Sequence, residues 1–204
     1  MTNMIVTSRP EEATRDRILK AAILRFSTHS YETASLRDIA SDVGIDAAYV
    51  HRSFGSKEKL FREVLRVVLQ SARLSDAATD DLPQALASQL LAPVSEHEVR
   101  PLDVIVRSFS SPEASNALRS ALMEHCVVPL SERREELSNR KAALILAALG
   151  GIGIMRYVVR SEPLLGGGDE VLREMIALMI EATMSLDERA LLSPSTFHEE
   201  ERLQ

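Results

Sequence analysis

Apolar residues near the start of the chain recur at the spacing of an amphipathic helix. The apolar stripe consists of Ile18, Leu19, Ala22 and Phe26. Pro10 suits the first turn of a helix, where its missing N–H has no partner to lose, and the acidic residues at 11 and 12 favour the positive end of the helix dipole. The pattern predicts a first helix from Pro10 to about His29.

A second, shorter apolar stripe predicts a helix from Leu36 to Val43. Ser35 and Asp38 have the spacing of a capping box, in which each side chain accepts a hydrogen bond from a backbone N–H of the first turn. Gly44 ends this helix, because glycine readily adopts the left-handed backbone conformation that follows many helices.

A third helix is predicted over residues 47–53, with Asp46 as its N-cap and with Val50 and Phe54 facing inward. Two short helices joined by a three-residue turn that contains glycine are typical of a helix-turn-helix. The second helix of such a motif can enter the DNA major groove and present side chains to bases and phosphates. Its outward positions here are Ala48, Tyr49, Arg52 and Ser53, with Ala47 and His51 at the flanks.

Helical spacing continues through the rest of the chain. A long fourth helix begins near Gly55 and runs through Leu69, and its first N–H groups together with Lys57 suit a phosphate. Further helices are predicted over 80–91, 100–110 and 111–127, the last broken or kinked by Pro129, and around 142–155 and 171–182. The prolines and short connections suggest a bundle with internal space for an apolar ligand.

The sequence therefore predicts an all-α protein of two domains. A three-helix helix-turn-helix domain at 10–60 is joined by the long fourth helix to a larger helical bundle at 61–190. A flexible acidic tail is expected at 191–204, which contains three consecutive glutamates.

The segment from Ala142 to Met155 contains no charged residue. It is shorter than the ~20 residues of a membrane-spanning helix, so a buried helix is predicted. Its glycines each cost about 1 kcal/mol relative to alanine, and close approach of a partner helix would explain them. A dinucleotide-binding loop is rejected because no strand precedes the glycines. With the last helix, the segment predicts a four-helix dimer interface that includes Leu146, Gly150, Gly153, Tyr157, Met175 and Met179.

Charge separates the two parts of the chain. The whole chain has 24 Lys or Arg against 30 Asp or Glu, a net charge of −6. Residues 1–70 hold 11 basic against 9 acidic residues, a net +2, whereas residues 71–204 hold 13 against 21, a net −8. A slightly basic head on an acidic body is compatible with nucleic-acid binding by the head, although +2 is less basic than many DNA-binding domains.

Composition bounds the class of protein. The 204 residues are 45% hydrophobic and 4% aromatic, enough to bury a core and too apolar for a wholly disordered chain. The single cysteine, Cys126, excludes an internal disulfide framework and a multi-cysteine zinc site. The first nine residues lack the apolar stretch of a secretory signal, which predicts a cytoplasmic protein with no membrane partner.

An enzyme is one rival class. The five histidines are scattered without metal-ligand spacing, and the side chains of His125 and Cys126 diverge on a helix, so no catalytic residue, metal ligand or cofactor is predicted. A second rival is a helical adaptor whose head binds a protein instead of DNA. Arg52 and Lys57, taken alone, are also consistent with solvated surface cations.

Residues 12 to about 65 resemble the N-terminal DNA-binding domain of TetR-family transcriptional regulators. The resemblance rests on Phe26 and on the segments Ile18-Leu19-Lys20-Ala21-Ala22, Ser35-Leu36-Arg37-Asp38-Ile39-Ala40, Val43-Gly44-Ile45 and Phe54-Gly55-Ser56-Lys57-Glu58-Lys59-Leu60-Phe61. The rest of the chain resembles the family in architecture and in the segment 153–165. Residues 30, 49, 51 and 53 depart from the family's usual choices, so the operator sequence is not predicted.

The resemblance implies a homodimeric DNA-binding transcriptional regulator, by family default a repressor, on a palindromic double-stranded operator. A small-molecule effector of unknown identity in the C-terminal domain would shift the spacing of the two DNA-binding heads. The expected DNA contacts are Ser35, Arg37, Asp46, Ala47, Ala48, Tyr49, His51, Arg52, Ser53 and Lys57. The ligand-binding residues are not predicted.

Overall fold

The computed structural model describes residues 10–71, 81–93, 99–109, 111–132, 134, 136–165 and 169–191. Within these ranges the chain forms helices and connections without a strand, which confirms the predicted all-α class. The helices are α1 (Pro10–Thr28), α2 (Leu36–Val43), α3 (Ala47–Phe54), α4 (Lys57–Ser71), α5 (Leu82–Leu91), α6 (Pro101–Ser108), α7 (Pro112–Leu122), α8 (Val128–Glu132), α9 (Asn139–Gly153), α10 (Glu162–Leu165), α11 (Asp169–Ser185) and α12 (Glu188–Leu191). The predicted acidic tail lies almost wholly outside the described residues.

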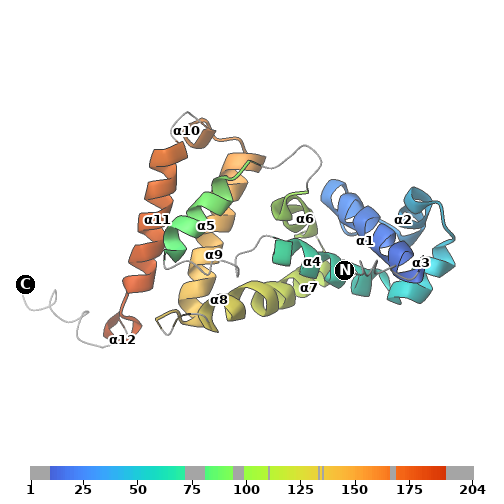
Figure 1. Ribbon diagram of the computed structural model, residues 1–204, viewed down its shortest axis with the longest axis horizontal. Helices are drawn as coiled ribbons and strands as arrows, with labels where there is room; N and C mark the ends of the chain where they lie inside the picture. The colour runs from blue at the N-terminus through green and yellow to red at the C-terminus, as the bar shows by residue number, and fades with distance from the viewer. Residues whose placement is uncertain are drawn as a thin grey trace, which may run out of the picture.

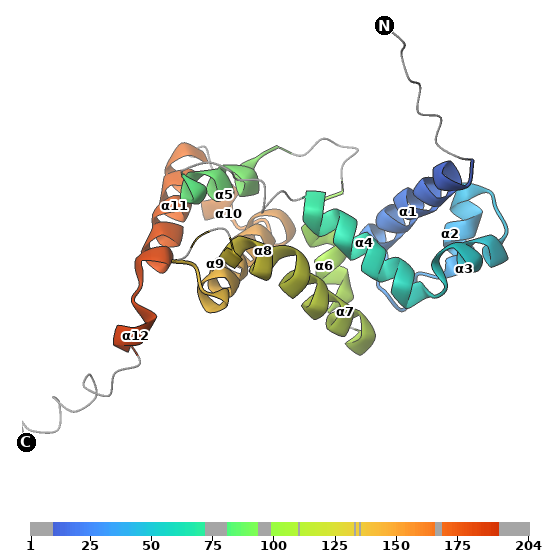
Figure 2. The same ribbon diagram turned by 60° about the horizontal axis from the view of Figure 1, so that its bottom comes forward.

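The helices form an elongated molecule. The head, α1–α3, lies at one end, and α5, α9 and α11 lie at the other (Figure 1). Between them α4 runs from the head into the body, packing against α1 and α7 (Figure 2). A second contact joins head and body where α6 packs on α1, and there the Arg107 Nε donates to the Ser27 carbonyl at 2.5 Å.

The helix ends of the head follow the predicted local chemistry. The Ser35 hydroxyl accepts from the Asp38 N–H, and the Asp38 carboxylate accepts from the Ser35 N–H, which completes the capping box. Gly44 has φ of 74°, in the left-handed region that favours glycine. The Asp46 carboxylate caps α3 by accepting from the Ala48 N–H at 2.6 Å. These three features place α2 and α3 as a helix-turn-helix.

One hydrophobic core runs from the head into the near part of the body. At its centre the Phe61 ring meets the rings of Phe26 and Tyr31 edge to face, with centroids 4.9 and 5.0 Å apart. We call this the proximal core, and its buried members extend from Ile18 on α1 through α4 to Cys126. The predicted domain boundary at residue 60 falls within it, because α4 belongs to both parts.

A second group, the distal core, fills the far end of the body. Its buried residues are Leu82, Leu86, Ala87, Val127, Leu130, Leu137, Ala142, Ile145, Leu149, Ile176, Ala177 and Ile180. They bring α5, α8, α9 and α11 together. The two cores divide the body into a part that holds the head and a part that carries the long apolar helices.

The helix expected to be broken or kinked by Pro129 continues past it, with a local change of helix type just before the proline. A π-helical segment, η1 (Met123–Val127), joins α7 to α8, and the Val128 N–H donates to the Met123 carbonyl five residues earlier. Proline has no N–H to donate to the residue four positions back, and a wider turn accommodates this loss. Pro129 is therefore accommodated by a local change from α-helix to π-helix, and the helix does not end there.

The segment without charged residues lies in α9 and is buried on one side only. Together with the π-helical segment η2 (Ile154–Val158), α9 forms 20 residues of mean hydropathy 1.5, which could cross a membrane by length and composition alone. It packs against α5, α8 and α11, as the core helix of a folded body does, yet only a third of it is buried. The predicted buried helix is thus buried on one side within the described chain, and its other apolar face points outward.

The glycines of α9 have two different environments. An ideal Cβ on Gly153 would lie 2.5 Å from the Leu102 Cδ1 on α6, whereas a Cβ on Gly151 would have nothing within 4 Å. Gly153 thus permits close approach of α6 within the chain, and not of a partner helix as predicted. The two positions offer a matched pair of substitutions in one helix.

We expect Gly151→Ala to raise the free energy of unfolding by about 0.5–1 kcal/mol, because alanine loses less backbone entropy in a helix. Gly153→Ala gains the same propensity but must displace Leu102, so it is expected to be about 1–3 kcal/mol less stable than Gly151→Ala. Urea unfolding of both variants measures the difference. Equal stabilisation by the two alanines would contradict the assignment of Gly153 to the α6 contact.

Candidate DNA-binding surface and dimer surface

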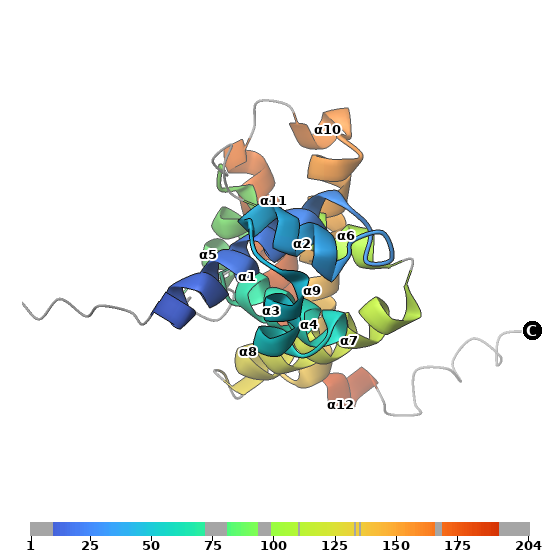
Figure 3. The same cartoon turned by 90° about the vertical axis from the view of Figure 1, so that its right-hand side faces the viewer.

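The helix-turn-helix lies at the tip of the molecule. Figure 3 looks onto this end, where α2 and α3 face outward in front of α1 and α4. On α3 the side chains of Ala48, His51 and Arg52 are exposed, and on α2 Arg37 is exposed. No other helix is drawn in front of α2 and α3 in this view. The second helix of the motif therefore has a free outward face.

Tyr49 bridges the outward face and the head core. Its ring is half-buried and packs against the proximal core, while the Arg52 guanidinium lies 5.7 Å from the ring centroid. Ala47 is likewise half-buried against this core. The α3 residues predicted to contact DNA thus divide into exposed side chains and side chains that also support the helix.

Two further predicted contacts, Ser35 and Asp46, already serve the local fold, and a third, Ser53, is partly covered. The Ser35 hydroxyl is 2.7 Å from the Asp38 carboxylate within the capping box, and Asp46 caps α3. Ser53 is half-buried near the end of α3. Contacts of these residues to DNA remain predictions, and Ser35 and Asp46 would have to make theirs alongside their capping roles.

Lys57 is held at the start of α4 by the head. Its Nζ lies 4.3 Å from the centroid of the Tyr31 ring and donates to the Glu32 carbonyl at 3.4 Å. A cation over an aromatic face is attracted by the ring quadrupole without being neutralised. Lys57 therefore retains a charge that a DNA phosphate could meet, and its predicted role is compatible with this position.

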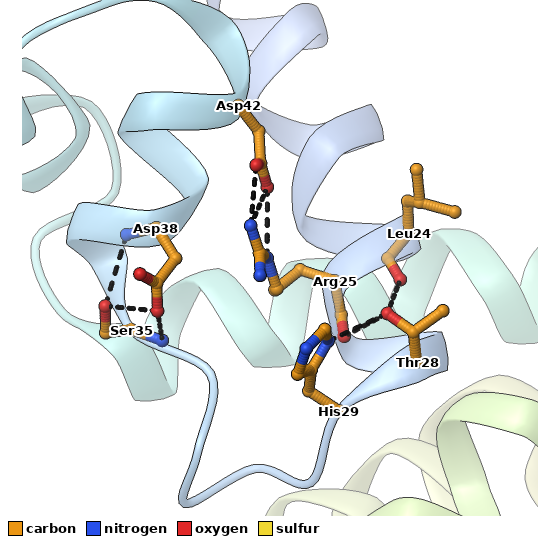
Figure 4. A network of polar contacts seen from close by, with 7 residues as sticks. All are labelled: Leu24, Arg25, Thr28, His29, Ser35, Asp38 and Asp42. Carbon is orange, nitrogen blue, oxygen red and sulfur yellow. Dashed lines mark hydrogen bonds and ion pairs between the residues drawn. The ribbon is translucent and has the colours of Figure 1, made fainter.

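An ion pair that the sequence did not reveal joins α1 to α2. The Arg25 guanidinium donates three hydrogen bonds to the Asp42 carboxylate, from Nε to Oδ2 at 3.0 Å and from Nη2 to Oδ1 and Oδ2 at 2.6 and 2.7 Å (Figure 4). The bond to Asp42 raises the pKa of Arg25. Asp42 lies in the last turn of α2, where a negative charge opposes the helix dipole, and Arg25 offsets it. The only sequence signal was an acid at an unfavourable helix end.

The predicted dimer residues do not share one surface. Leu146 packs against both cores, Gly153 is buried against α6, and the Tyr157 hydroxyl donates to the Leu90 carbonyl at 2.8 Å. By contrast, Met175 and Met179 on α11 are exposed. Gly150 lies between these cases, because it is half-exposed and a Cβ built on it would have nothing within 4 Å. Leu146 and Gly153 therefore face inward, whereas Met175 and Met179 remain available for a partner.

Beyond the exposed polar residues Asn139 and Arg140 at its start, the outward face of α9 is apolar. Its exposed residues there are Ala143, Leu144, Ala147 and Gly151, and Met155 continues the stripe on η2. On the neighbouring α11, the exposed apolar residues are Val171, Met175, Leu178, Met179 and Ala182. We call these two stripes the α9–α11 face. Exposed apolar patches that span two helices are typical of protein interaction sites.

A groove of about 810 Å³ opens beside this face, between α5, α11 and the start of α9. Its lining is largely polar and includes the acidic residues Asp81, Glu136, Glu174, Glu181 and Asp187. Lys141 lies within it and donates from Nζ to the carbonyls of Glu136 and Met184. This lining differs from the apolar internal site that the bundle pattern suggested.

Cys126 is buried in the proximal core. Burial raises the pKa of its thiol to about 11, so the nucleophilic thiolate is scarce near neutral pH. Its neighbour His125 lies on the same π-helical segment, η1. Cys126 thus behaves as a small core residue.

Comparison with known proteins agrees with this geometry. Residues 18–64 match the family model described as bacterial regulatory proteins, tetR family, and residues 80–184 match the one described as tetracyclin repressor-like, C-terminal domain. The HTH-type transcriptional regulator BetI of Agrobacterium fabrum is 33% identical over 63 residues, which cover 31% of each chain. This chain thus spans about a third of the length of that curated relative.

Solved structures show the same fold over most of the chain. A TetR-family regulator from Streptomyces coelicolor A3 is 26% identical with a TM-score of 0.55, covering 87% of this chain and 98% of its own. A putative transcriptional regulator from Saccharomonospora viridis, crystallised with choline, is 19% identical with a TM-score of 0.58, covering 83% of this chain and 96% of its own.

A helical body with a helix-turn-helix at its tip is the architecture of DNA-binding regulators that combine both parts in a single chain. Within that class, the chain belongs to the TetR family. Members of this family are DNA-binding transcriptional regulators with ligand-binding C-terminal domains, and they are generally not enzymes.

Proposed function

We propose that the protein is a cytoplasmic transcriptional repressor that binds a palindromic operator as a homodimer. The observation that carries this proposal is the free outward face of α3 at the tip of the head, with Arg52 exposed on it. A two-fold dimer presents two such helices to successive major grooves, about 34–36 Å or a multiple apart. Phosphate contacts from Lys57 and from helix N-termini would set the register, and α3 side chains would read the bases.

The α9–α11 face supports the dimer. It is the exposed apolar surface of two adjacent helices, and two copies related by a two-fold axis would form a four-helix interface. The same surface in both copies then contacts itself, which is the arrangement of most homodimers. In this proposal Met175 and Met179 remain in the interface, and Leu144, Gly151 and Met155 replace the inward-facing α9 residues.

A small-molecule effector bound in the C-terminal domain would release the DNA by changing the spacing of the two heads. The contacts of α4 with α7 and of α6 with α1 support this route, because they connect the body to the head. A thermal-shift screen of small metabolites and drugs tests the proposal, since a binder stabilises the folded state by mass action.

We expect the protein to bind a duplex taken from upstream of its own gene more tightly than a scrambled duplex of equal length. If a dimer makes six or more phosphate contacts, its affinity should fall about 10³-fold between 50 and 200 mM salt. Fluorescence anisotropy at several salt concentrations measures both properties.

Arg52→Ala provides the matched test of the α3 face. Loss of a base contact should weaken binding to the specific duplex by about 1–3 kcal/mol. Arg119→Ala, on the exposed surface of α7, is the control and should bind as the unchanged protein does. Equal, salt-independent binding to both duplexes would favour the helical adaptor instead.

A further inference from the structure

We propose that Arg15 and Arg17 are positioning residues, which hold the two helices of the helix-turn-helix in place and do not contact DNA. The inference rests on the proposed DNA-binding function. It distinguishes basic residues of the head that orient helices from basic residues that contact DNA phosphates. Neither arginine is among the residues that the sequence indicated, because their partners lie far along the chain.

Arg15 contacts the end of α3, the outward helix of the motif, through two groups and α4 through a third. Its Nη1 donates to the Ser53 carbonyl at 3.3 Å, and its Cζ lies 4.1 Å above the centroid of the Phe54 ring. Its Nη2 is 3.9 Å from the Glu63 Oε1 on α4. One planar guanidinium therefore joins α1 to the last turn of α3 and to α4.

Arg17 makes the corresponding contact with the first helix of the motif. Its Nη2 donates to the Val43 carbonyl, at the last residue of α2, at 2.8 Å. The last carbonyls of a helix have no partner within the helix, and a guanidinium there also meets the negative end of the helix dipole. Arg15 and Arg17 thus stabilise the C-terminal ends of α3 and α2 by the same chemistry.

Glu63 fixes the position of Arg15 from the other side. Its carboxylate bonds to Arg66 at 2.8 and 3.1 Å, and this contact lowers the pKa of Glu63. A carboxylate that stays ionised keeps its attraction for a second guanidinium. Arg15 is therefore held between a helix end, an aromatic ring and a charge, with its cation directed to groups of the protein.

This arrangement predicts that DNA affinity depends differently on salt when a helix-orienting basic residue is removed than when a phosphate-contacting one is removed. A cation that neutralises a phosphate releases counterions, so its removal lowers the slope of log affinity against log salt by roughly 0.9 per contact. A cation that only orients α3 contributes to affinity through geometry, because a misplaced helix loses contacts made by other residues.

The test compares Arg15→Gln and Arg17→Gln with Lys57→Gln as the phosphate reference and Arg119→Gln as the neutral control. Affinity for the duplex from upstream of the gene is measured by fluorescence anisotropy at five salt concentrations. We expect Arg15→Gln to bind roughly tenfold more weakly with an unchanged salt slope. Lys57→Gln should lower the slope by about 1.8 for the dimer, and Arg119→Gln should change neither quantity.

Arg15→Lys separates charge from shape. Lysine keeps the positive charge but lacks the planar fork that donates to a carbonyl while stacking on a ring. We expect Arg15→Lys to bind about as weakly as Arg15→Gln. Full affinity in Arg15→Lys, a slope loss in Arg15→Gln equal to that of Lys57→Gln, or unchanged affinity in Arg15→Gln would each overturn the proposal.

Hydrogen exchange tests the same proposal without DNA. In Arg15→Gln the amides of α3 should exchange about tenfold faster, while those of the buried centre of α1 keep their protection. Arg17→Gln should accelerate exchange at the end of α2 instead. If the unchanged protein binds neither duplex, the proposed function fails, and the exchange result still decides the positioning role. Unchanged α3 exchange in Arg15→Gln would overturn it.

Discussion

Replacing Met175 with glutamate is expected to convert the protein to monomers and to lower its affinity for a palindromic duplex at least a hundredfold. Met175 is 62% exposed in the middle of the α9–α11 face. In a two-fold interface the new carboxylate would be buried in both copies without a partner, a change that costs several kcal/mol. Loss of the second head then removes the gain in affinity that comes from binding two half-sites at once.

Sedimentation velocity and anisotropy with the same duplex measure the two effects of Met175→Glu. Met123→Glu is the matched control, because Met123 is 42% exposed on η1 and lies outside the α9–α11 face. We expect it to sediment as the unchanged protein does. A Met175→Glu variant that still sediments as a dimer would show that the protein pairs through another surface.

Phe61→Ala is expected to lower the free energy of unfolding by about 3–5 kcal/mol. The Phe61 side chain is fully buried on α4, and its ring contacts Phe26 on α1 and Tyr31 in the following connection. The cavity left by alanine would lie where the head meets the linking helix, and well-packed surroundings collapse into such cavities only in part. DNA affinity should fall with stability, because α3 is carried by this core.

Urea unfolding followed by circular dichroism measures the loss in Phe61→Ala. Phe109→Ala serves as the control, because Phe109 is 58% exposed at the end of α6 and should change stability by less than about 0.5 kcal/mol. If the free energy of unfolding of Phe61→Ala fell by less than about 1 kcal/mol, the aromatic cluster would not be a main source of stability where the head meets α4.

Features determined by neighbouring residues were predictable from the sequence. The capping box of Ser35 and Asp38, the left-handed Gly44 and the Asp46 cap each depend on side chains and backbone groups within four positions. The helix-turn-helix follows from these signals, and the family resemblance of the head has been confirmed by comparison. The DNA contacts themselves are still predictions.

The orientation of α9 was not predictable, because both of its faces are apolar. In most helices polar residues mark the solvent side, and here the outward face carries Leu144, Ala147 and Met155 instead. The periodicity therefore predicted the helix but not which of its faces points inward, and of the two glycines predicted at the dimer interface, Gly153 lies against α6 of the same chain. The contacts of Arg15 and Arg17 were hidden for a different reason: they reach backbone carbonyls 38 and 26 residues away, which no side-chain pattern records.

Because of the π-helical segment η1, the continuous helix formed by α7, η1 and α8 packs against both the proximal and the distal core. Each residue of an α-helix turns by about 100°, so one additional residue in a turn rotates everything beyond it by that angle. Ahead of η1, Ala117 and Leu118 of α7 face the proximal core, whereas Val127 at the end of η1 and Leu130 of α8 face the distal core. The continuous helix formed by α7, η1 and α8 therefore presents two differently oriented faces. One packs toward the linking helix α4, and the other packs toward the helices of the α9–α11 face.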